Sequence, residues 1–112
     1  MSAPRLSRAL VLEAPGDAPD GAGGFAEGWT PLGTLWAEVT PRAGREAAGP
    51  ADPVARAGFR IRVRAAPPGD PARPRPGQRF AEGGRRFRIL AVAEAGPRGL
   101  YLDCLAEEEL SP

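Results

Sequence analysis

The 112-residue sequence contains no histidine, no lysine and no asparagine, and it has a single cysteine. Without histidine, the usual general base and the commonest metal ligand are missing, and the serines have no imidazole to activate them. One cysteine forms neither an intramolecular disulfide nor a cysteine cluster for a metal. We therefore predict no catalytic residues, no metal site, no cofactor and no enzymatic activity.

An excess of one charge and long apolar runs are also absent. Fifteen basic residues, all arginine, face fourteen acidic ones, for a net charge of +1. A dedicated nucleic-acid binder needs a clear positive surplus to neutralise phosphates, so this balance argues against one. No stretch is long or apolar enough to span a membrane, and the N-terminus lacks a signal-peptide pattern. We expect a soluble protein made in the cytoplasm, with no membrane partner.

Short alternating segments separated by glycine and proline predict an all-β fold. The clearest is "FRIRVRA" (59–65), with apolar residues on one face and arginines on the other. Residues 14–24, dense in Pro, Asp and Gly, are predicted to form a turn or a mobile hairpin tip. We predict one domain over 1–112, a small antiparallel β-barrel or sandwich of five or six strands with at most one short helix, capped by Asp52. The strands are expected near 5–13, 33–40, 59–65, 78–82, 86–95 and 99–107, and the long Pro/Gly-rich loops at 42–58 and 66–77.

Alternation also predicts which side chains share a face. Trp36 is expected to point away from Leu35 and Ala37, and Cys104 to lie in the core. The proline-rich segment 67–77 is predicted to be an extended excursion. In "RFRILAVAEA" (86–95), one face is expected to hold Phe87, Ile89, Ala91 and Ala93, and the other Arg88, Leu90, Val92 and Glu94.

Both tryptophans of the chain fall within residues 28–41. They are either core anchors or hot spots of an oligomer interface, and the pattern leaves open which of the two is which. The arginine face of 59–65 has three interpretations: phosphate binding, a solvated face with cross-strand glutamate pairs, or contacts to carboxylates of another subunit. The lack of net positive charge favours the second over the first.

The order of these segments resembles the phage head–tail joining family, the small head-closure or stopper proteins of long-tailed phages and gene transfer agent particles. Two blocks carry the resemblance: "W..L.TLWAEV.P..G.E" (29–46) and "G.RFRILAV…RG.YL.C..EE" (84–108). It extends over nearly the whole chain. Relatives often have a short polar connection after the 59–65 strand, leading to an arginine. Here the connection is "APPGDPARPRPGQR", and Arg79 is the best match.

The resemblance implies a β-barrel protomer in a ring of six or twelve copies at the head–tail interface of a virion-like particle, assembled in the bacterial cytoplasm. The ring would sit below the portal and adaptor, close the DNA channel and dock the tail. A tail terminator or tail tube protein would lie below it, and double-stranded DNA would pass through without sequence-specific binding. The expected subunit-interface residues are Trp29, Trp36, Arg60, Arg62, Arg64 and Arg79. The candidate channel loop is 42–58, with Arg42, Arg45, Glu46, Asp52 and Arg56.

A different class of function also fits the pattern. A small barrel could bind single-stranded nucleic acid if Phe59, Trp36 and the arginines formed a stacking platform. Salt-dependent binding of oligonucleotides by the purified protein would favour this alternative.

Overall fold

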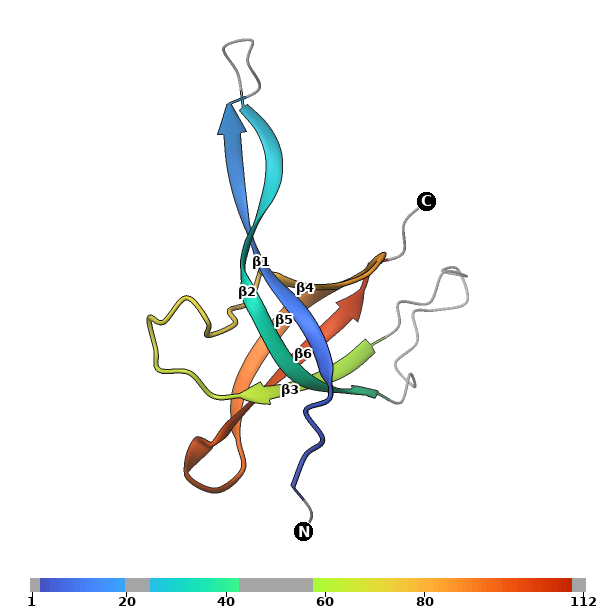
Figure 1. The fold of residues 1–112 in the computed structure, drawn as a ribbon, viewed down its shortest axis with the longest axis vertical. Helices are drawn as coiled ribbons and strands as arrows, with labels where there is room; N and C mark the ends of the chain where they lie inside the picture. The colour runs from blue at the N-terminus through green and yellow to red at the C-terminus, as the bar shows by residue number, and fades with distance from the viewer. Residues whose placement is uncertain (1–2, 20–24, 43–57, 110–112) are drawn as a thin grey trace.

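A computed structural model of the chain describes residues 3–19, 25–42 and 58–109. Six antiparallel strands pair around a closed barrel in the order β1-β2-β3-β6-β5-β4 (Figure 1). The predicted all-β class is confirmed, as a closed barrel. The elements are β1 (Arg8–Pro19), β2 (Phe25–Pro41), β3 (Gly58–Arg64), β4 (Arg79–Glu82), β5 (Arg85–Ala95), the 3-10 helix η1 (Pro97–Gly99) and β6 (Tyr101–Glu108).

Inward-facing side chains fill the barrel completely. Phe59 and Phe87 meet edge to face there, with ring centroids 5.3 Å apart. Cys104 is fully buried as predicted, and burial raises its pKa to about 12. The barrel is therefore a packed core and not a pore. Its buried core comprises Leu10, Leu12, Ala37, Ile61, Val63, Phe80, Phe87, Ile89, Leu102, Cys104 and Ala106.

A β-bulge in β5 reverses the predicted alternation halfway along the strand. The register with β6 shifts between Ile89 and Ala91, which leaves Leu90 as the extra residue, 45% exposed. Beyond it Val92 lies opposite Cys104 and packs against the core, while Ala91 and Ala93 are exposed. The prediction that Ala91 and Ala93 share the face of Phe87 is wrong, because one inserted residue exchanges the two faces.

The β1–β2 hairpin is longer than the sequence predicts. Part of the segment expected to be a turn is strand, since β1 continues to Pro19 and β2 begins at Phe25. Beyond the barrel each of these two strands has only one neighbour. A proline is tolerated on such an edge because it can turn the side that lacks an N–H toward solvent.

The proline-rich connection between β3 and β4 is a packed loop and not an extended excursion. Successive turns fold it, with the Asp70 N–H donating to the Pro67 carbonyl at 3.0 Å and the Arg73 N–H to the Asp70 carbonyl at 2.9 Å. The Arg73 guanidinium also donates to the Ala66 carbonyl at 2.8 Å, and Pro74 is fully buried. The short helix expected at Asp52 lies outside the described residues.

Candidate subunit interface

One outward row of side chains crosses β2, β3 and β6 at one end of these strands. Ala37 faces the core opposite Val63, so its neighbour Trp36 points outward, and 60% of it is exposed. On β3 and β6, Arg64 lies opposite Tyr101, with its guanidinium 5.9 Å from the ring centroid. Leu100, just before Tyr101, is 46% exposed. We call Trp36, Arg64 and Tyr101 the tryptophan face, and its composition is typical of protein interfaces.

Trp29 has a different environment, where the hairpin leaves the barrel. Its ring lies under the guanidinium of Arg79, 4.0 Å from the centroid. The same guanidinium donates to Glu13 at 2.6 Å and lies 3.5 Å from Glu109. Trp29 and Arg79, both expected at the subunit interface, are thus engaged within the chain, where they fix the base of the hairpin to β4.

The arginine face of β3 is largely paired with carboxylates of the same barrel. Arg62 makes two hydrogen bonds to Asp103, directly opposite on β6, at 2.6 and 2.8 Å. Hydrogen bonding to Arg62 lowers the pKa of Asp103, and the same bond raises the pKa of Arg62. Arg60 is 4.0 Å from Glu38, and its Nε is buried without a hydrogen-bond partner among the described residues. Cross-strand pairing therefore accounts for Arg62, whereas Arg60 retains an unused donor.

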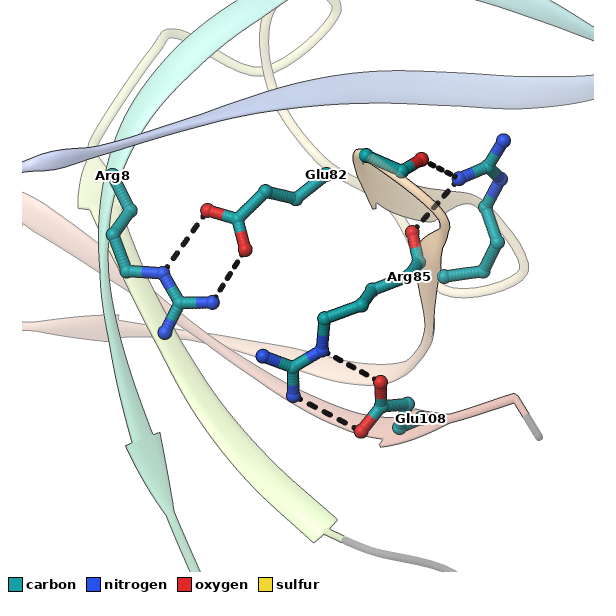
Figure 2. A network of polar contacts seen from close by, with 6 residues as sticks. Arg8, Glu82, Arg85 and Glu108 are labelled. Atoms are coloured by element: carbon teal, nitrogen blue, oxygen red, sulfur yellow. Dashed lines mark hydrogen bonds and ion pairs between the residues drawn. The ribbon is translucent and has the colours of Figure 1, made fainter.

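A charged rim of four side chains, Arg8, Glu82, Arg85 and Glu108, lies at one end of the barrel (Figure 2). Arg8 donates to Glu82 at 2.5 and 3.1 Å, and Arg85 donates to Glu108 at 2.7 and 3.0 Å. Arg85 also lies 4.9 Å from the centroid of the Phe87 ring. All four residues stand two positions beyond a core residue on their strands. The strand alternation therefore directs them toward the barrel end.

The rim is ionised at neutral pH. Hydrogen bonding to Arg8 lowers the pKa of Glu82, and hydrogen bonding to Arg85 lowers that of Glu108. The bidentate geometry accounts for both shifts, since each carboxylate accepts two charge-assisted bonds. Because core side chains fill the interior, no large molecule can pass through the barrel itself.

Most of the predicted channel loop lies outside the described residues, including Arg45, Glu46, Asp52 and Arg56. Arg42 is described, and its backbone N–H donates to the Gly58 carbonyl at 2.9 Å. The two ends of the candidate loop therefore leave the barrel side by side.

The stacking platform required for single-stranded nucleic acid is not formed. Phe59 packs against the core inside the barrel, whereas Trp36 lies outside it. Across residues 3–19, 25–42 and 58–109, no cluster of acidic or cysteine side chains could hold a metal ion. No helix in that part of the chain is long and apolar enough to cross a membrane.

A filled barrel with an uncovered aromatic face defines a small structural module suited to assembly. A family model described as "Phage head completion protein" matches residues 1–109, and the chain belongs to this family. The chain is thus a structural protein of a virion-type particle and not an enzyme. The resemblance found from the sequence is confirmed.

One solved structure agrees with this assignment, and a second shares the fold. The chain is similar to one in the structure titled "Virion of native gene transfer agent (GTA) particle", with 54% identity, a TM-score of 0.79, and coverage of 96% of this chain and 98% of that one. Protein SF1141 from Shigella flexneri 2a shares the fold, with 22% identity, a TM-score of 0.66, and coverage of 96% of each chain. No curated protein matches the chain.

Proposed function

We propose that the chain is the head-closure protein of a tailed particle, a gene transfer agent or a tailed phage. It forms a ring of six or twelve copies below the portal and adaptor, closes the DNA channel and docks the tail terminator or tail tube protein. Double-stranded DNA passes along the ring axis without base-specific contacts. Family membership supports the head-completion role, and the likeness to a chain of a gene transfer agent virion supports the type of particle.

The observation that carries the ring is the exposure of Trp36. An indole that is 60% exposed on a strand face leaves roughly 90–150 Å² in water, and covering that area contributes about 2–4 kcal/mol. The neighbouring positions Arg64 and Tyr101 provide the charged and aromatic groups that often surround such an anchor. Because the barrel itself is filled, the DNA path has to lie between copies, which a ring provides.

Replacing Trp36 tests this proposal in the whole particle. Trp36→Ala should leave the purified chain folded, with a nearly unchanged melting temperature, since the side chain contributes little to the core. Particles assembled with this variant should accumulate as tailless or empty heads, counted by electron microscopy. Leu90→Ala is the matched control, because Leu90 is a second exposed apolar residue on another strand. Normal tailed particles with Trp36→Ala would refute the proposed interface.

The closing element stays a prediction from the sequence, because the segment 43–57 lies outside the described residues. Deleting residues 46–54 shortens the loop while keeping the Arg42–Gly58 hydrogen bond at its base. Heads carrying this deletion should assemble and package DNA but lose it before tail attachment. Full retention of DNA, measured by nuclease protection, would assign the closure to another part of the protein.

A further inference from the structure

Although the net charge is near zero, acidic residues and arginines are unevenly distributed along the chain. Residues 9–41 carry five acidic residues and no arginine. The remainder carries all fifteen arginines and nine carboxylates, a formal charge of +6. Apart from Arg8 at the start of β1, strands β1 and β2 therefore form an acidic hairpin on an otherwise basic protein. The five acidic residues are Glu13, Asp17, Asp20, Glu27 and Glu38.

The outer half of this hairpin pairs with no barrel strand, and it contacts the barrel at its base, where Trp29 packs under Arg79. Residues 14–19 of β1 and 25–30 of β2 pair only with each other, whereas the inner halves pair also with β4 and β3. This outer half, which we call the arm, projects away from the barrel along the longest axis of the molecule (Figure 1). A two-stranded ribbon is marginally stable by itself in water. The arm is thus a structure that gains from a partner.

Some acidic residues of the hairpin accept hydrogen bonds within the chain, whereas those further along the arm lie opposite one another. At the base of the arm, Glu13 accepts a hydrogen bond from Arg79 at 2.6 Å. At the far end of β2, within the barrel, Glu38 accepts one from the Arg5 backbone N–H at 2.9 Å. Further out, Asp17 and Glu27 occupy directly opposed register positions. Two like charges at opposed positions destabilise an antiparallel pair, and the arm contains no arginine.

We propose that the arm docks on the arginine-bearing barrel surface of a second copy of this chain. The arm carries two acidic residues and no arginine, and the chain outside residues 9–41 has a formal charge of +6, so contact between copies brings opposite charges together. Exposed arginines are available on the barrel at Arg64, Arg88 and Arg98. An arm that reaches from each copy to the next is a heterologous contact, the kind that closes into a ring. The inference extends the proposed function by naming the contact between neighbours, and it rests on that function.

Asp17→Arg separates docking from folding. It converts the opposed acidic pair into an opposite-charge pair, so the hairpin should be as stable as before or more so. Docking on arginines should nevertheless weaken. By sedimentation equilibrium of the full chain, wild-type association should be strongest at low salt, and Asp17→Arg should weaken it by at least about tenfold. Glu94→Arg, with the same charge change on β5, is the matched control and should have a much smaller effect. Should Asp17→Arg lower the melting temperature, Glu27→Arg makes the same reversal from the opposite strand.

A second reversal identifies the acceptor surface. Combining Asp17→Arg with Arg64→Glu, Arg88→Glu or Arg98→Glu in turn should restore association only where the reversed residue meets the arm. Wild-type chains that stay monomeric at low salt, or association that Asp17→Arg leaves unchanged, would overturn the inference. The inference would also be overturned if the chain associated only after a portal or tail protein was added, because the arm would then bind that protein and not a second copy. Particles in which Trp36→Ala blocks tailing and Asp17→Arg does not would reject arm docking while keeping the head-closure role.

Discussion

The ion pair between Arg62 and Asp103 allows a quantitative test of what the arginine face of β3 does. Arg62→Met removes the positive charge and keeps the apolar stem of the side chain, and Asp103→Asn removes the negative charge and keeps the shape. A double-mutant cycle of these two changes isolates their coupling. If Arg62 serves the fold, the cycle shows a clear interaction energy in the isolated protein. If it serves mainly an interface, the coupling vanishes and association is lost instead.

The geometry sets the expected magnitude. The two hydrogen bonds are 2.6 and 2.8 Å long, and the Arg62 and Asp103 side chains are only 22% and 19% exposed. Hydrogen bonds to charged groups contribute about 1.5–3 kcal/mol, and partial solvation and desolvation costs reduce that figure. We expect a coupling free energy of about 1–2 kcal/mol. The fall in melting temperature for either single variant should be about 3–10 °C in a domain of this size.

The assay is urea denaturation of the four proteins, followed by circular dichroism at neutral pH, with equal m-values confirming comparable unfolding. Arg60 and Glu38 provide the matched control, on the same outer face but 4.0 Å apart and with side chains 39% and 28% exposed. Their cycle, from Arg60→Met and Glu38→Gln, should give less than about 0.5 kcal/mol. A coupling at Arg62 and Asp103 no larger than this control would refute the assignment of Arg62 to the fold.

Three further predictions concern acid, a turn and the thiol. Hydrogen bonds from arginine lower the pKa values of Asp103 and Glu82, so these ion pairs stabilise the fold above the unfolded-state pKa and stop doing so as the pH falls through the folded-state pKa. The melting temperature should therefore decrease at pH values below about 4. A melting temperature that stays constant in that range would contradict this prediction. Gly99→Ala should lower the free energy of unfolding by about 1–2 kcal/mol, because φ at Gly99 is +63° and an added Cβ would lie 2.9 Å from a carboxylate oxygen. Gly84→Ala is the control: a Cβ there meets open space, so the free energy of unfolding should change by less than about 0.5 kcal/mol. Cys104, buried and with a pKa raised to about 12, should resist alkylation until the protein unfolds, and rapid labelling of the native protein by mass spectrometry would show otherwise.

Local alternation was enough to predict the parts of the fold that follow period two without interruption. In β3 the buried Ile61 and Val63 alternate with arginines, as expected. On β2 the same rule placed Trp36 and Ala37 on opposite faces, although it did not say which face is buried; Ala37 lies in the core and Trp36 is exposed. These positions depend only on neighbours in the sequence, and the side-chain direction of a strand is a local property.

Features that depend on distant contacts were not predictable in this way. The bulge at Leu90 is fixed by how β5 pairs with β6, and no residue in the β5 sequence marks it. Trp29 and Arg79 are fifty positions apart, and only barrel closure by β1 and β4 brings them together. The hairpin strands were missed because proline and glycine are read as breakers, although a solvent-facing edge accepts them. Long-range pairing therefore determined which of the two tryptophans was left uncovered.

In the proposed ring, the distribution of charge would decide how the protein interacts with DNA, more than the net charge does. A chain of net charge +1 suggests a neutral surface, yet residues outside 9–41 sum to +6. Bare copies with that many arginines would hold phosphates tightly and impede passage of the genome. If each acidic arm covers arginines on its neighbour, those arginines pair with carboxylates and cannot bind phosphates. The proposed ring then has fewer free arginines facing the DNA. Arm-reversed rings that still assemble should then bind duplex DNA more strongly and with a steeper salt dependence than wild-type rings.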